Sequence, residues 1–216
     1  MKRYLISAAV QLLLGLVTGP WFPAAANNLP QSQSALTLLL RVHDDAGADP
    51  RIVASAMDRV NAVYADVGIS TEWARVERLA GKADYGVPTL DVSIVGADAA
   101  KQLTTAIAGH ERVMGQAAMS VDRAYVFYDR IIDAAVTMKR FPGNFLGDVI
   151  AHEIGHLLLP GRSHSERGIM RANVPLNERL QTFDDDQAHS VRSTIAALSR
   201  ELIPPEPQQS KSVNSA

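Results

Sequence analysis

Cysteine is absent from this chain of 216 residues. Disulfide bonds and thiolate metal ligands are therefore excluded, and histidine, aspartate and glutamate are left as possible metal donors. A surplus of basic residues is missing as well, because 21 lysines and arginines stand against 23 aspartates and glutamates. This charge balance argues against a nucleic-acid-binding surface, and we expect no nucleic-acid partner.

Long apolar segments are also missing, except at the N-terminus. Lys2 and Arg3 precede an apolar run at 4–17, and the small residues Ala24-Ala25-Ala26 follow it. A basic start, a short apolar run and small residues in this order are typical of a secretory signal peptide. The run is shorter than the about 20 residues that span a bilayer, so we favour cleavage over an uncleaved anchor. We predict a signal peptide at 1–26 and a secreted or periplasmic protein without stable membrane insertion.

The rest of the chain is predicted to hold one domain and a tail. Residues 27–203 are numerous enough to bury a hydrophobic core in a single domain. Removal of Lys2 and Arg3 leaves 19 basic residues against 23 acidic ones, a net charge of −4. Residues 204–216 are rich in proline, serine and glutamine, which predicts disorder. The sequence does not indicate an oligomeric state.

Residues 148–159 hold the most informative pattern of the chain, His152-Glu153-x-x-His156. Side chains four residues apart lie on one face of an α-helix, so the two imidazoles can point at a single ion. Glu153 directly follows the first histidine and can reach a water molecule at that ion without being a ligand. Two histidines and a glutamate in this spacing on a helix are typical of a zinc hydrolase.

The sequence around this motif predicts the helix that the motif requires. Apolar residues recur at helical spacings from Phe145 onward, which indicates a helix. Asn144, after the turn-forming pair Pro142-Gly143, is the predicted N-cap. Pro160-Gly161 is predicted to end the helix, because proline disfavours the helical conformation of the residue before it.

A catalytic zinc usually has three protein ligands, so a third donor is expected beyond the helix. His164 is the main candidate, since the Pro160-Gly161 turn can lead the chain back to the histidine pair. Glu178 and Asp184 are the alternatives, because acidic side chains can also be zinc ligands. The other histidines lack partners at ligand spacing and are predicted to be surface or capping residues: His43, His110 and His189.

These residues resemble the metzincin clan of metallopeptidases, whose pattern is His-Glu-x-x-His-x-x-Gly-x-x-His followed by a turn that carries a methionine. Gly161 and His164 keep the Gly-x-x-His spacing of the clan, although both stand two residues later than the pattern requires. Gly168-Ile169-Met170 resembles the methionine turn, with Met170 in the role of its methionine. The resemblance indicates no specific family within the clan.

The resemblance implies an α+β fold of the zincin type, in which a twisted mixed β-sheet packs with helices, among them an active-site helix and a C-terminal helix. It implies one Zn2+ ion held by His152, His156 and His164, with Glu153 as the catalytic general base that activates water. We therefore predict that 27–203 is the catalytic domain of an exported zinc metallopeptidase acting on a peptide or protein substrate. A binding or structural protein on the same scaffold, with little or no turnover, is the alternative. The presence of Glu153 favours the enzyme.

The remaining elements are predicted from periodicity and turn signals. Helices are expected at 50–66 and 99–108, and a final helix is expected to be capped by Thr182. The strand at 124–128, just before the active-site helix, is expected to form the rim of a cleft and to pair with an extended substrate. Further strands are expected at 35–42, 69–76, 90–95 and 113–118.

Overall fold

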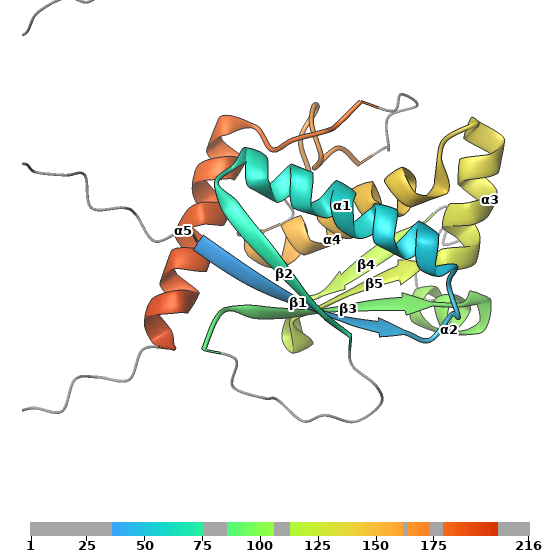
Figure 1. Ribbon diagram of the computed structural model, residues 1–216, viewed down its shortest axis with the longest axis horizontal. Coiled ribbons are helices and arrows are strands. Elements are labelled where there is room, and N and C mark those ends of the chain that lie inside the picture. The colour runs from blue at the N-terminus through green and yellow to red at the C-terminus, as the bar shows by residue number, and fades with distance from the viewer. Residues whose placement is uncertain (1–35, 76–85, 106–112, 162–163, 173–178, 203–216) are drawn as a thin grey trace, which may run out of the picture. The chain divides into compact units, whose positions relative to one another are not determined.

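A mixed β-sheet is the base of the fold (Figure 1). Its strands are β1 (Leu36–Asp44), β2 (Ile69–Arg75), β3 (Thr89–Val95), β4 (Gly115–Ala118) and β5 (Arg123–Phe127). Their order across the sheet is β2-β1-β3-β5-β4. All neighbouring strands run parallel except β4, which pairs antiparallel with β5. The strands β2 and β4 are therefore the two edges, and all five predicted strands are present with ends shifted by at most two residues.

The computed structural model describes residues 36–75, 86–105, 113–161, 164–172 and 179–202, which lie in one compact unit, Ser34–Ala216. The predicted signal peptide, the predicted tail, His110 and Glu178 fall outside these ranges. Within them, no helix combines the length and the apolar character needed to cross a membrane.

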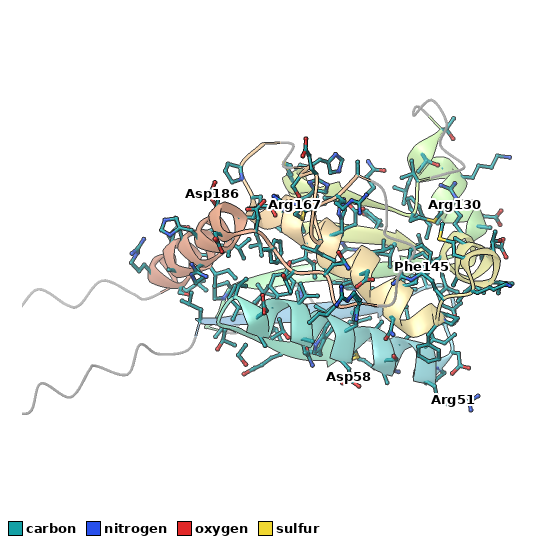
Figure 2. All side chains as sticks on the ribbon, turned by 90° about the horizontal axis from the view of Figure 1, so that it is seen from above. Arg51, Asp58, Arg130, Phe145, Arg167 and Asp186 are labelled. Carbon is teal, nitrogen blue, oxygen red and sulfur yellow. The ribbon has the colours of Figure 1, made fainter. Side chains whose placement is uncertain are left out.

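Two long helices, α1 (Pro50–Asp66) and α4 (Pro142–Leu158), pack side by side on one face of the sheet (Figure 1). Arg51 and Asp58 are exposed on the outer side of α1 (Figure 2). Most residues of α4 are buried, including the charged Asp148, so this helix is the centre of the core. The inner side of α1 contributes a stripe of small apolar residues to the same core: Val53, Ala56, Val60 and Val63.

Shorter helices complete the described part of the chain: α2 (Ala97–Thr104), α3 (Tyr128–Met138) and the C-terminal helix α5 (Asp185–Glu201). A short 3-10 turn at Met119–Val121 joins β4 to β5. The helix α2 covers the other face of the sheet at one end, where it buries Val95 and Phe127. The predicted architecture is confirmed: a mixed sheet packed with helices, an active-site helix and a C-terminal helix.

The start of α4 differs from the prediction. The helix begins at Pro142, with Phe141 as its N-cap, and Phe145 N–H already donates to the Phe141 carbonyl at 3.1 Å. The predicted turn before Asn144 is therefore the first turn of the helix. Proline is well tolerated there, because its missing N–H has no helical partner at that position and its fixed φ suits a helix. The predicted end is confirmed, since Leu159 is the C-cap before Pro160.

Two other details of the prediction are wrong. Asp184, not Thr182, caps α5: its carboxylate accepts the Gln187 N–H at 2.9 Å, and the Gln187 side chain accepts the Asp184 N–H at 3.4 Å. This reciprocal pair is a capping box, which satisfies two N–H groups at once. In addition, the predicted rim strand β5 lies inside the sheet, between β3 and β4, and Tyr128 already belongs to α3.

Candidate metal centre

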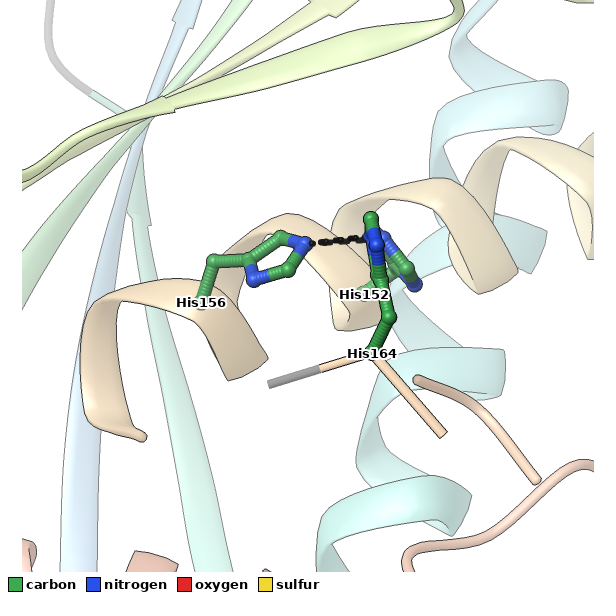
Figure 3. Close-up of side chains that lie close together, drawn as sticks. All are labelled: His152, His156 and His164. Atoms are coloured by element: carbon green, nitrogen blue, oxygen red, sulfur yellow. Dashed lines mark hydrogen bonds between the residues drawn. The ribbon is translucent and has the colours of Figure 1, made fainter. Parts of the chain in front are cut away.

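Three histidines converge at one end of α4 (Figure 3). Nε2 of His156 lies 3.0 Å from Nε2 of His152 and 3.1 Å from Nε2 of His164. The nitrogens that could act as ligands all lie within 4.8 Å of one another, and no other such group occurs among the described residues. The structure thus brings together the two helical histidines and the loop histidine that the sequence pattern singled out.

The connection between His156 and His164 explains how the loop histidine reaches this point. The helix continues to Leu158, and Leu159 is extended and buried, with only 5% of its surface exposed. Gly161 then has a positive φ of 75°, a conformation that glycine adopts without strain and that suits a turn. The two residues beyond the metzincin spacing therefore lie in this connection and do not keep His164 from the pair.

The orientation of His152 is fixed by a backbone group. Its Nδ1 lies 2.8 Å from the carbonyl oxygen of Ile169. Because a carbonyl can only accept, the imidazole proton is on Nδ1, and Nε2 carries the free lone pair that faces the other histidines. A histidine that ligates a metal almost always donates its second ring N–H in this way.

The electrostatics of the group favour neutral imidazoles. Burial, together with the neighbouring His152 and His164, lowers the pKa of His156 to about 4. Burial also lowers the pKa of His152, an effect that the hydrogen bond to Ile169 opposes. At neutral pH both side chains therefore keep the lone pair that metal binding requires.

Met170 lies beneath the helix that carries the histidines. Its side chain is fully buried, and a Cβ at Gly155 would overlap its sulfur. The turn before it contains Gly168, with a φ of 75°, and is closed by a hydrogen bond of 2.9 Å from Ser165 N–H to the Met170 carbonyl. Glycine at 155, between the two helical histidines in sequence, leaves the space that the methionine occupies.

Glu153 lies between α4 and the edge strand β4. Only 7% of its surface is exposed. A Cβ at Gly115 of β4 would lie 2.7 Å from its Cγ, and the Ala117 N–H donates a hydrogen bond to it. Burial raises the pKa of its carboxyl from 4.5 to about 8, although the hydrogen bond from Ala117 opposes the rise. The predicted general base is therefore a carboxyl with a strongly raised pKa that lies against the edge strand β4.

The alternative donor Asp184 and the other described histidines lie elsewhere. The Asp184 carboxylate caps α5 and is not part of the histidine group. His189 is exposed on α5. His43 lies on the far face of the sheet, with Nε2 2.8 Å from an oxygen of the buried Asp91, which also pairs with arginines. Glu178 and His110 lie outside the described residues.

The site also uses groups that the sequence pattern did not reveal. These are the Ile169 carbonyl, the Ala117 N–H and the space at Gly115. Backbone groups have no characteristic residue type, so no motif could identify the first two. Glycine inside a strand is a usable signal, because it often marks the close approach of another group.

No protein-family model and no curated protein matches this chain. Among solved structures, it is similar to the archaemetzincin of Methanopyrus kandleri, with 16% identity and a TM-score of 0.45, over 78% of this chain and 99% of that one. It is also similar to a zinc-dependent peptidase of Methanocorpusculum labreanum, with 14% identity and a TM-score of 0.44, over 71% of this chain and 99% of that one. At this level the likeness is a distant one.

Proposed function

We propose that this protein is an exported zinc-dependent metalloendopeptidase. The observation that carries the proposal is the convergence of His152, His156 and His164, with the buried Glu153 next to His152 in the same helix. Three histidine donors with one coordination position left for water are the usual set of a catalytic zinc, whereas structural zinc sites have four protein ligands. Neutral imidazole nitrogens suit zinc, and the donors available here fit one ion.

Glu153 is the proposed general base. A zinc ion at the three histidines would polarise a substrate carbonyl and lower the pKa of water. The positive charge would also lower the pKa of Glu153 from about 8, because an opposite charge favours the ionised carboxylate. The ionised side chain can then take a proton from the attacking water and deliver it to the departing amine.

The edge strand β4 is the proposed docking strand for the substrate. Among the described residues it pairs on one side only, with β5, and Glu153 lies directly against Gly115 and Ala117. An extended peptide can add to such an edge through backbone hydrogen bonds. The strand favoured by the sequence, β5, is paired on both sides and cannot accept a peptide.

The alternative is a binding or structural protein that holds zinc without turnover. The burial of Glu153 argues against this alternative, since a carboxyl whose pKa is strongly raised by burial costs the folded state stability at neutral and higher pH. Such groups are characteristic of sites with a chemical role. Export rests on the signal-peptide pattern of residues 1–26, which favours a secreted or periplasmic location.

Metal analysis and peptide cleavage by the purified protein test the proposal. We expect one zinc per chain, bound by both the wild type and Glu153→Gln, and at least about a 100-fold loss of cleavage in the variant, as for a missing general base. Glu72→Gln removes an exposed carboxylate on β2 and is the matched control. Absence of zinc, or equal cleavage by wild type and Glu153→Gln, would contradict the proposal. Zinc without cleavage by the wild type would support the alternative.

A further inference from the structure

Arg59 of α1 stands at the beginning of a series of hydrogen bonds that ends at His152. Its Nε donates to Oδ1 of Asp148 at 2.7 Å, and its Nη2 lies 3.4 Å from Oδ2. The pair is deeply buried, with side-chain exposures of 9% and 4%. A buried charged pair of this kind requires good geometry, because both groups have lost their hydration.

The need to neutralise the charge of Asp148 does not by itself explain why Arg59 is buried here. Asp148 already has a second cation, Arg140, whose Nη2 donates to Oδ2 at 2.7 Å and whose side chain is 1% exposed. Nη2 of Arg59 also donates a hydrogen bond to the backbone carbonyl of Arg179. The guanidinium therefore bridges two elements: the helix that carries the histidines and the segment 179–182 that precedes α5.

The packing of α1 on α4 places Arg59 for this bridge. A Cβ at Gly147 would lie 2.6 Å from Cβ of Arg59 and 2.8 Å from the Ala56 carbonyl oxygen. The absence of a side chain at 147 thus lets the stem of Arg59 lie directly on α4. A guanidinium has donors in a fixed planar fork, so it can serve a carboxylate and a carbonyl in one orientation.

The segment 179–182 is in turn connected to the metal centre. The Thr182 carbonyl accepts the Ile169 N–H at 2.9 Å. The carbonyl of Ile169 accepts from Nδ1 of His152 at 2.8 Å. Ile169 is therefore held through its N–H by the segment that Arg59 fixes, and it sets the tautomer and direction of His152 through its carbonyl.

We propose that Arg59 is a positioning residue for His152, acting through Arg179, Thr182 and Ile169. This proposal adds a supporting residue to the proposed zinc site and rests on that proposed function for the zinc-affinity measurement. The tautomer of His152, in contrast, can be measured without metal. Without Arg59, the segment 179–182 loses its tie to α4, the Ile169 carbonyl becomes free to move, and His152 no longer has a single preferred tautomer.

Arg59→Met in the purified protein tests the proposal. Methionine keeps an unbranched stem against Gly147, removes the guanidinium that binds Asp148 and the Arg179 carbonyl, and leaves Asp148 paired with Arg140. The control is Val53→Ala, which truncates a buried side chain of the same helix and loosens α1 without touching the bridge. The readouts are the ring 15N shifts of His152 in zinc-free protein, which report its tautomer, and zinc affinity by competition with a chelator, with thermal unfolding as the measure of stability.

In Arg59→Met we expect mixed His152 tautomers and zinc affinity about tenfold weaker, the low end of what the loss of a group supporting a metal ligand causes. Val53→Ala is expected to lose stability while both readouts stay at wild-type values. If Arg59→Met matches Val53→Ala in both readouts, the proposal is wrong. If the wild type binds no zinc, the proposed function fails, and the tautomer measurement still decides the role of Arg59.

Arg59→Lys covers the case in which the methionine variant does not fold. Lysine keeps the charge beside Asp148, but its single ammonium group lacks the planar fork that serves the carboxylate and the Arg179 carbonyl together. We expect a folded protein in which the tautomer preference of His152 is weakened. Wild-type behaviour of Arg59→Lys in both readouts would overturn the proposal.

Discussion

The burial of Glu153 predicts an unusual pH dependence of stability in the zinc-free protein. Burial raises the pKa of this carboxyl from 4.5 to about 8, so the folded state binds its proton more tightly than the unfolded state does. Between these two pH values the unfolded chain releases the proton and the folded chain keeps it. The contribution of Glu153 to stability is therefore fully present below about pH 4.5 and is lost as the pH rises through about 8.

The size of the effect follows from the same two values. A rise of this extent corresponds to a free energy on the order of 5 kcal/mol. We expect the free energy of unfolding of the wild type, relative to that of Glu153→Gln, to fall by about this amount between pH 4.5 and 9. Since whole domains are stable by only about 5–15 kcal/mol, the change should be large in urea titrations.

Urea unfolding of both proteins in the presence of a chelator, at several pH values, is the measurement. His152 and His156 also affect the pH profile, because their lowered pKa values give stability above pH 6.5 that is lost on acidification. They are present in both proteins, so subtraction isolates Glu153. Saturating zinc should shrink the difference, since a cation favours the ionised carboxylate. A difference that stays constant within about 1 kcal/mol from pH 4.5 to 9 would refute the reasoning.

Two further substitutions test the packing around the site. Gly115→Ala places a Cβ 2.7 Å from Glu153 Cγ and 2.9 Å from the Tyr125 carbonyl oxygen. We expect the free energy of unfolding, measured in urea, to fall by about 1–3 kcal/mol and peptide cleavage to weaken. Unchanged values of both would show that β4 is not packed tightly against Glu153. Met170→Ala leaves a cavity at a fully buried position below α4. We expect the free energy of unfolding to fall by about 2–5 kcal/mol and one zinc per chain to be retained. A fall of less than about 1 kcal/mol would contradict the tight packing at Gly155.

Local sequence rules predicted those parts of the site that depend on one element. His152, Glu153 and His156 are placed by helical spacing alone, and the end of α4 follows from Pro160. His164 was within reach because the turn that leads to it is short and contains Gly161. In each case the deciding residues lie within a few positions of one another, so short-range geometry is sufficient.

The parts that sequence rules missed depend on contacts between distant segments. The exposed edge at β4, rather than β5, follows from strand order, to which strands far apart in the chain contribute. The charged cluster joins Asp91 of β3 to Arg41 and His43 of β1 and to Arg123 of β5, and it has no motif. The bridge from Arg59 to Arg179 likewise spans 120 positions. Alternation of apolar residues identifies strands, but it does not order them.

The burial of α4 on nearly all sides limits how this protein can change over evolution. An α-helix turns by about 100° per residue, so one insertion between Gly147 and His152 would swing the imidazoles away from His164 while the contact with Arg59 stayed in place. A change of length between Gly147 and His152 would therefore separate the direction of the histidines from the packing of the helix. The two residues by which the chain exceeds the metzincin pattern stand after Leu158, where they do not change the direction of the helical histidines.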